Sequence, residues 1–180
     1  MTLDQILWET GRIAALTAFF VISASILSGQ ALRSSLFDGL IRNRELLSVH
    51  RFLTVCWLPL VGLHVVALML DSVARVRPLD LLMPFQVSYA ALPIGLGTLG
   101  FDLLLVITVS SYLRGRLDGQ AWRWIHRLSY AMFLLFALHG WLAGTDFSRT
   151  VVLAPAAGVL AFAGVLTLAR VAFGRLDPAG

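Results

Sequence analysis

Two apolar stretches decide the fold of this chain: SVHRFLTVCWLPLVGLHVVALMLD at 48–71 and AWRWIHRLSYAMFLLFALHG at 121–140. Together they contain all 4 histidines of the sequence, two in each stretch. His50 and His64 are 14 residues apart, and His126 and His139 are 13 apart. On a helix that rises about 1.5 Å per residue, these separations are roughly 21 Å and 20 Å. Because the hydrocarbon core of a bilayer is about 30 Å thick, each pair marks two depths within one membrane.

The composition of the 180 residues is that of a membrane protein with one domain. Hydrophobic residues make up 58% and charged residues 13%, and the mean hydropathy is +0.84, far more apolar than a soluble domain. The isoelectric point of about 10.2 could indicate nucleic-acid binding, but the basic residues separate hydrophobic spans and form no patch with aromatic residues. The single cysteine, Cys56, has no partner for a disulfide or CxxC motif and is expected to be a small buried hydrophobe.

We predict an all-α fold, an integral membrane bundle of five transmembrane helices that forms a single transmembrane domain over 1–180. Each predicted span has about the 20 residues needed to cross a bilayer. The spans are Ile13–Leu32, Phe52–Leu70, Ala90–Leu113, Trp124–Leu142 and Val151–Arg170. The first span is expected to be retained, because Asp4 and Glu9 precede it and a cleaved signal peptide begins with basic residues.

The basic residues predict the orientation of these spans. With five crossings, one face carries Arg12, Arg75, Arg77 and Arg149, which are four of the 14 basic residues, and the opposite face carries the other ten. Basic residues accumulate on the cytoplasmic side of membrane proteins. We therefore expect the N-terminus outside and the C-terminus in the cytoplasm, in a multi-pass protein of a bacterial inner (cytoplasmic) membrane.

The second and fourth spans cross in the same direction, since one span separates them. His50 and His126 are therefore expected at a shared cytoplasmic level, and His64 and His139 at a shared outer level. One imidazole from each of two helices at each level is the arrangement that holds a haem between helices. Two such haems would make the chain a conductor of electrons across the membrane.

Helical phase tests this interpretation with a mixed result. Fourteen residues turn by about 1,400°, only about 40° short of four full turns, so His50 and His64 share a face. Thirteen residues turn by about 1,300°, which is about 140° short. His126 and His139 can therefore point the same way only if their helix is kinked or locally rewound, or if their rotamers differ.

Several neighbouring residues are candidates for contact with the haems. Trp57 lies seven residues from each histidine of its own helix, so its indole is expected between the two levels, with Met132 and Phe133 at the matching midpoint opposite. Gly62 and Gly140, each close to an outer-level histidine, would leave room for a porphyrin plane, although helix packing alone also explains them.

Charged residues near the histidines have competing explanations. Arg51 and Arg127 each follow a cytoplasmic-level histidine and would pair with haem propionates, or serve only the cytoplasmic charge bias. Asp102, near the middle of the third span, is either a proton-relay group or, as we favour, a neutral acid bonded to Thr98 or to another helix. The GxGxxG pattern at 95–100 has no preceding strand, so we interpret it as helix packing through small residues.

The chain resembles the ferric reductase-like transmembrane domain family, which includes the membrane cores of NADPH oxidases and ferric reductases and the haem subunit of a bacterial periplasmic methionine-sulfoxide reductase. The resemblance covers about 48–146, the expected haem-binding core. It rests on the two histidine stretches, their spacings of 14 and 13, PLDLLMPF at 78–85, FDLLLVITVSSYLRGRL at 101–117 and GTD at 144–146. It implies two b-type haems, ligated by His50 with His126 and by His64 with His139, and electron transfer from the cytoplasmic side to the outside.

The resemblance also bears on partners and activity. The sequence ends ten residues after Arg170 without an FAD- or NAD(P)H-binding domain. We therefore expect membrane lipid around the chain, a redox partner on each side (a flavoprotein, a quinol or a periplasmic acceptor), and other membrane subunits as further candidates. No catalytic residue is visible, so an oxidoreductase activity at the outer level stays open.

Other functions also stay open from the sequence alone. The first is a structural or assembly subunit of a membrane complex, with one haem or none. The second is a proton or metal transporter that uses Asp102 and the histidines. A zinc site is less favoured, because zinc takes three or four ligands at one place.

Overall fold

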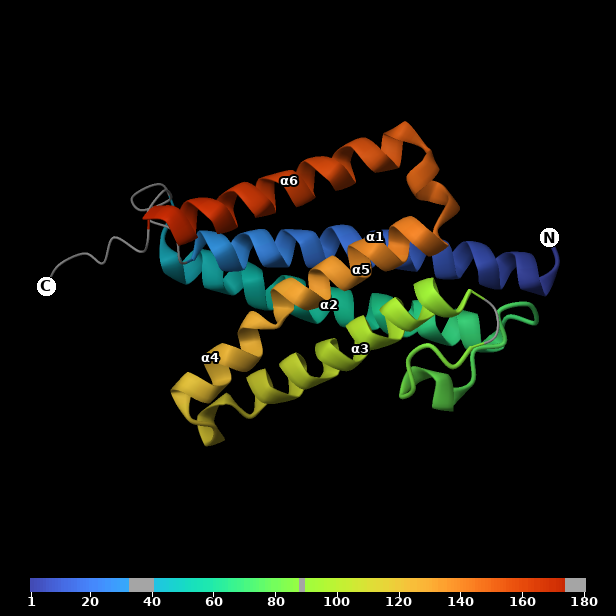
Figure 1. Cartoon of the computed structure of the whole chain (residues 1–180), viewed down its shortest axis with the longest axis horizontal. Helices are drawn as coiled ribbons and strands as arrows, with labels where there is room; N and C mark the ends of the chain where they lie inside the picture. Colours follow the sequence, from blue (N-terminus) through green and yellow to red (C-terminus); the bar gives the residue numbers. More distant parts are fainter. Residues whose placement is uncertain (33–40, 88–89, 174–180) are drawn as a thin grey trace, which may run out of the picture.

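The computed structural model describes residues 1–32, 41–87 and 90–173, and all regular structure within these ranges is helical, which confirms the all-α prediction. Figure 1 shows the arrangement of the helices. In chain order the elements are α1 (Leu3–Ala31), α2 (Asn43–Leu70), η2 (Pro78–Leu81), α3 (Ala91–Tyr112), η3 (Arg114–Arg116), α4 (Gly119–Arg127), α5 (Ser129–Ala143), η4 (Thr145–Ser148) and α6 (Thr150–Phe173). The η elements are short 3₁₀ turns.

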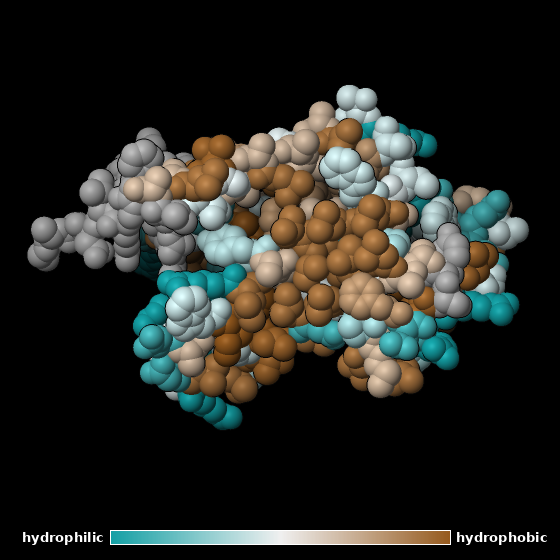
Figure 2. Space-filling view, in the orientation of Figure 1, coloured by the Kyte–Doolittle hydropathy of each residue, from teal (hydrophilic) through white to brown (hydrophobic). Residues whose placement is uncertain are grey.

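Among the described residues, four helices are long and apolar enough to cross a membrane: α1, α2, α3 and α6 over Thr150–Ala169. Large apolar side chains such as Phe52, Val109 and Leu168 are exposed on these helices. Figure 2 shows hydrophobic residues over the middle of the visible face and hydrophilic residues at both ends. An apolar surface band of this kind is what a bilayer would cover, so the chain is a multi-pass membrane protein.

The predicted fourth span, 124–142, differs from the structure. It forms two helices, α4 and α5, which meet at Leu128. The Leu128 amide bonds the carbonyl of Ile125, three residues back, at 3.0 Å, so the α-helical bonding pattern is interrupted there. Asp118 starts α4 by accepting hydrogen bonds from the amides of Gln120 at 2.8 Å and Ala121 at 2.9 Å.

Two helices begin earlier in the sequence than the spans predicted for them, which start at Ile13 and Phe52. The first span starts at Leu3 because Thr2 caps it: the Thr2 hydroxyl accepts from the Gln5 amide, and the Gln5 side chain accepts from the Thr2 amide. The second helix starts at Asn43, with an ion pair between Arg42 and Glu45 in its first turn. Polar first turns extend both helices beyond the apolar stretches used to predict them.

The bundle consists of two long helix pairs with a core between them. α1 lies along α2, and α3 lies along α5 (Figure 1). Small residues such as Ala14 and Ala18, which are almost fully buried, line α1 and allow close packing. Phe19 of α1 stacks on Phe133 of α5 with 5.9 Å between ring centroids. α6 is tied to α1 by Gln30, whose side-chain amide donates to the Ala163 carbonyl at 3.1 Å.

The glycines at 95–100 serve close packing, as predicted. A Cβ atom at Gly95 would lie 2.1 Å from the Phe85 ring, and one at Gly100 would lie 2.9 Å from the Phe136 ring. Both distances are too short for a real Cβ contact, so these positions accept only glycine without rearrangement. The same part of α3 is tied to the connecting segment by Thr98, whose hydroxyl donates to the Asp80 carbonyl at 3.1 Å.

Candidate functional site

The structure brings together the histidines that the sequence analysis pairs. His50 of α2 and His126 of α4 have ring centroids 6.2 Å apart, with ring planes at 80°. His64 of α2 and His139 of α5 have centroids 6.3 Å apart, with ring planes at 67°. We call these the inner pair and the outer pair. The break at Leu128 lies between His126 and His139, and a break there is one of the ways in which residues 13 apart can face the same side.

The spacing within each pair fits a metal ion held between two imidazoles. An imidazole nitrogen binds a metal at about 2.0 Å, and each nitrogen lies about 1.1 Å from the centre of its ring, so two axial ligands have ring centres roughly 6.2 Å apart. The observed values of 6.2 Å and 6.3 Å agree with this geometry. Within the described residues, no three His, Cys, Asp or Glu side chains converge. A histidine-rich zinc site of three or four ligands is therefore not formed by them.

Backbone carbonyls of other helices fix the orientation of the outer pair. Nδ1 of His64 donates to the Gly11 carbonyl of α1 at 3.0 Å. Nδ1 of His139 donates to the Pro93 carbonyl of α3 at 2.7 Å. A carbonyl only accepts, so each Nδ1 carries the proton and each Nε2 keeps its lone pair for a ligand. A hydrogen bond from the other ring nitrogen to a carbonyl is the usual support of a metal-binding imidazole.

His50 of the inner pair has the same kind of support from α1. Its Nδ1 donates to the Ser25 carbonyl at 2.9 Å, with the hydroxyls of Ser25 at 3.2 Å and Ser28 at 3.3 Å also nearby. The Ser28 hydroxyl donates to the same Ser25 carbonyl at 2.8 Å. Three oxygen atoms therefore surround this nitrogen, and they fix the His50 tautomer with Nε2 unprotonated.

His126 is held by an aromatic stack. Its imidazole lies on the Trp122 indole, with 5.0 Å between ring centroids and 21° between planes. The Arg114 guanidinium lies over the Trp122 ring, 4.2 Å from its centroid. The indole therefore contacts both the imidazole and the guanidinium, and stacking on it restricts the plane of the imidazole.

Glycines let helix backbones approach these imidazoles. A Cβ atom at Gly97 of α3 would lie 2.7 Å from Nδ1 of His139. A Cβ atom at Gly29 of α1 would lie 3.4 Å from the His50 ring. Gly97 is therefore required for the seat of His139, and Gly29 allows close approach at His50.

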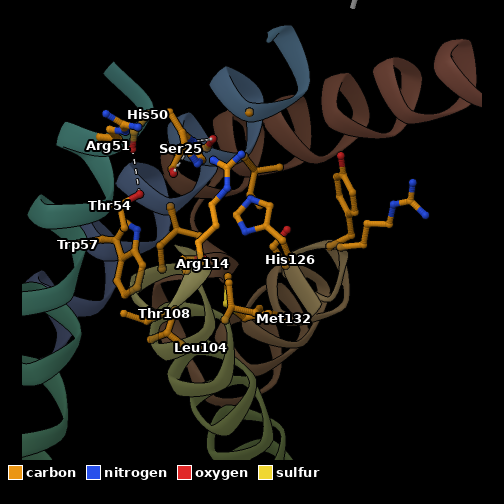
Figure 3. Close-up of a pocket in the computed structure, with 18 of the residues that line it drawn as sticks. Ser25, His50, Arg51, Thr54, Trp57, Leu104, Thr108, Arg114, His126 and Met132 are labelled. Atoms are coloured by element: carbon orange, nitrogen blue, oxygen red, sulfur yellow. Dashed lines mark hydrogen bonds between the residues drawn. The ribbon is translucent and has the colours of Figure 1, made fainter. Parts of the chain in front are cut away.

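The inner pair lines a cavity of about 560 Å³ (Figure 3). This volume falls within the roughly 300–1,000 Å³ of sites that bind cofactors and small molecules. The inner wall is apolar and includes Ile22, Trp57 and Leu104. Four basic residues also line the cavity: Arg51, Arg114, Arg123 and Arg127. A flat apolar group with acidic substituents fits a lining that combines apolar and basic side chains.

The four arginines differ in their contacts. Figure 3 shows the Arg114 side chain directed into the cavity. The Arg127 guanidinium lies over the Trp124 ring, 4.5 Å from its centroid. None of the four forms an ion pair with a carboxylate among the described residues. Their positive charge is thus available to an anionic group in or beside the cavity.

The other predicted site residues fall into two groups. Trp57, Met132 and Phe133 are 4–6% exposed and belong to the core between the two helix pairs. Gly140 makes room for Phe147, whose ring lies 2.9 Å from the position of a Cβ at 140, whereas no atom lies within 4 Å of that position at Gly62. Phe147 thus occupies the space beside Gly140, and Gly62 faces open space.

The sequence analysis favoured a bond from Asp102 to Thr98 or to another helix, and the bond to Thr98 is not formed. The Thr98 hydroxyl donates to the Asp80 carbonyl instead. Asp102 is partly buried on α3, and within the described residues it forms no hydrogen bond. It lies outside the set of residues that line the inner cavity.

Several residues that support the site were missed by the sequence analysis. The acceptors Gly11, Ser25 and Pro93 act through backbone atoms, which leave no trace in residue type. Gly97 was recognised only as part of a packing pattern. Trp122 had a detectable signal, because a tryptophan four residues before a histidine lies one turn away on the same helix face. Arg114 lies outside that helix and had none of this kind.

One of three comparisons with known proteins found a match. The sequence matches the family described as ferric reductase like transmembrane component over residues 10–137, a range that includes His50, His64 and His126. Comparison with curated proteins gave no match, and neither did comparison with solved structures. Since the family match covers more than half of the 180 residues, the resemblance seen in the sequence is confirmed, and the chain belongs to the ferric reductase-like transmembrane family as a component of transmembrane electron transfer.

Proposed function

We propose that this chain carries electrons across a bacterial inner membrane through two b-type haems. His50 and His126 would hold one haem, and His64 and His139 the other. The observation that carries the proposal is the pair of ring-centroid distances, 6.2 Å and 6.3 Å, each at the spacing of two axial ligands. Haem iron between two imidazoles supplies a one-electron couple, whose potential the surrounding protein tunes.

The imidazoles of this chain are prepared for that role before any metal binds. The bonds from Nδ1 of His64 and His139 to backbone carbonyls hold the proton on Nδ1. Each Nε2 then presents a lone pair without a change of tautomer. The donors and acceptors lie on different helices, so bundle packing itself sets the ligand geometry.

The middle of the bundle would insulate the path between the two levels. Trp57 lies seven residues from each histidine of α2, and Met132 and Phe133 lie six or seven residues from each histidine opposite. All three are buried in the core. They exclude water from the space between the pairs and keep its dielectric constant low.

The arginines at the inner cavity would bind the propionates. Arg51 and Arg127, the two arginines that the sequence analysis considered for this role, line the cavity, and Arg114 reaches into it from η3. Guanidinium groups bind carboxylates through two parallel hydrogen bonds. Two propionates would neutralise part of the charge of the four arginines, which leaves a net positive surface for a redox partner.

The topology that we propose has five crossings within one domain, with α4 and α5 completing the fourth. α5 is about 22 Å long at 1.5 Å per residue, and the last turn of α4 extends it. The end of the bundle near α4 carries many arginines and few carboxylates. These arginines are Arg42, Arg44, Arg51, Arg114, Arg116, Arg123 and Arg127. The positive-inside rule then assigns this end to the cytoplasm and the N-terminus to the outside.

This charge distribution also suggests the partners. An electron donor with an acidic surface would be steered to the arginine-rich cytoplasmic end, and the association would weaken as salt increases. A flavoprotein or a quinol would donate there, and a periplasmic acceptor would take electrons from the outer level.

The test is the haem content and the reduced-minus-oxidised spectrum of the purified protein. We expect two b-type haems per chain, one lost in His50→Ala and the other in His64→Ala. Asp102→Asn, an intramembrane change away from both pairs, is the matched control and should retain both. Absence of haem from the wild-type protein would refute the proposal. Haems that never become reduced from the cytoplasmic side of sealed vesicles would refute the transfer across the membrane.

A further inference from the structure

The short helix η4 contacts both α1, near His64, and α5, near His139. Its Asp146 accepts two hydrogen bonds from Arg12 of α1, from Nε at 3.0 Å and from Nη2 at 2.5 Å. The Asp146 side chain is 12% exposed and that of Arg12 is 26% exposed. A bidentate ion pair with this little exposure is among the stronger polar contacts between two elements. α1 and η4 are therefore tied at one defined point.

The α1 side of this ion pair leads directly to His64. Arg12 follows Gly11, whose carbonyl accepts the Nδ1 hydrogen of His64 at 3.0 Å. The N-terminal end of α1 is also bonded to the residues that follow α2, because the Ser72 hydroxyl donates to the Asp4 carboxylate at 2.6 Å. A shift of α1 at Arg12 would therefore move the acceptor that orients His64.

The η4 side leads to His139. Phe147, next to Asp146, fills the space that Gly140 leaves open, and Gly140 is the neighbour of His139. The Phe147 ring also meets Phe19 of α1 edge to face, with 5.7 Å between centroids. Asp146 and Phe147 thus hold α5 against α1 within one residue of the second outer histidine.

We propose that Arg12, Asp146 and Phe147 are positioning residues that set the separation of His64 and His139, and with it the occupancy of the outer level alone. The inference rests on the proposed function, since it concerns the same two haems. The contacts that orient the inner pair come from other residues, Ser25 of α1 for His50 and Trp122 of α4 for His126. A specific loss at one level is what distinguishes positioning from general support of the fold.

The test compares haem content in variants of the ion pair. In Arg12→Gln and in Asp146→Asn, we expect haem content to fall from two per chain toward one. The spectrum of the remaining haem should match that of His64→Ala and differ from that of His50→Ala. The exchange of both residues, Arg12→Asp with Asp146→Arg, should restore part of the second haem, because it restores an ion pair in the same place although Glu9 and Arg149 then lie beside like charges. Glu9→Gln is the matched control: it removes the Arg12–Glu9 ion pair but leaves the pair between Arg12 and Asp146, and should retain two haems.

A more conservative substitution of Arg12 distinguishes a positioning effect from a failure to fold. Arg12→Lys keeps the charge but cannot form the bidentate pair, so both haems should remain while the electron paramagnetic resonance signal of the outer one shifts. Two haems with unchanged signals in Arg12→Gln would overturn the positioning role and leave the proposed function intact. Equal loss of both haems in Arg12→Gln and Asp146→Asn would also overturn it, since the effect would then be general. A wild-type protein without haem would instead refute the proposed function itself.

Discussion

Replacement of Gly97 by alanine puts a methyl group where the outer pair has no room for it. The added Cβ would lie 2.7 Å from Nδ1, 2.8 Å from Cε1 and 3.1 Å from Cγ of His139. All three atoms belong to a ring fixed by its 2.7 Å bond to the Pro93 carbonyl. The ring must therefore tilt or retreat, and either movement strains or breaks that bond.

The expected cost follows from these contacts. A buried donor left without its acceptor costs about 1–3 kcal/mol, and an extra methyl group in a packed interior costs about the same. Because the imidazole can relieve part of both by tilting, we expect a net loss of about 1–3 kcal/mol in binding at the outer level. At about 1.4 kcal/mol per factor of ten, this is roughly a 5- to 150-fold loss of affinity for the outer haem.

The assay is titration of the haem-free protein with haem, followed by optical absorption of the two bis-histidine sites. Gly158→Ala and Gly164→Ala make the same chemical change on α6, where no atom lies within 4 Å of the new Cβ, and should leave both affinities unchanged. The inner site of Gly97→Ala should also be unchanged. Wild-type affinity at both sites of Gly97→Ala would refute the argument that His139 is seated against the α3 backbone.

Three further predictions follow from other contacts of the site. Trp122→Ala removes the ring stacked on His126, so haem affinity at the inner level should fall several-fold while the outer level is unaffected, as two-site haem titration would show. Ser25→Ala removes only a hydroxyl and keeps the carbonyl that accepts from His50, so inner-level affinity should change by less than in Trp122→Ala; a larger loss would mean that the hydroxyl is the main acceptor. The hydrogen bond from Arg12 holds the pKa of Asp146 below its usual range, so the stability that the ion pair contributes is complete above about pH 4, the ordinary aspartate pKa, and is lost as the pH falls through the lowered value. Thermal unfolding of Asp146→Asn should therefore show a smaller loss of stability in acid than that of the wild-type protein. The remaining loss comes from other carboxylates with lowered pKa values, such as Asp80 and Asp118.

The pairing of the histidines could be predicted because it depends on periodicity and on the number of crossings. Two imidazoles 14 residues apart on α2 share a face in any α-helix, and one intervening span makes α2 and the α4–α5 segment parallel. The 13-residue spacing of His126 and His139 predicted either a distortion of the helix or a difference in rotamers, and the helix is broken at Leu128. Regular helical geometry was sufficient for these conclusions.

The support of the site could not be predicted in the same way. The atoms that orient His50, His64 and His139 are backbone carbonyls, and every residue has one. Which carbonyl faces which imidazole depends on the rotation and offset of neighbouring helices, and a single sequence does not encode these in residue type. The tie between Arg12 and Asp146 spans 134 positions of sequence, so only the folded bundle brings it to light.

The interruption of helical bonding at Leu128 has a mechanical consequence. α4 and α5 are separate rigid segments, and each carries one histidine. α4 is short and largely exposed, so a protein that docks against it would apply force at His126 but would transmit little of it to His139. In the proposed electron path, contact with a partner at α4 would therefore change the surroundings of the haem held by His126 more than those of the haem held by His139.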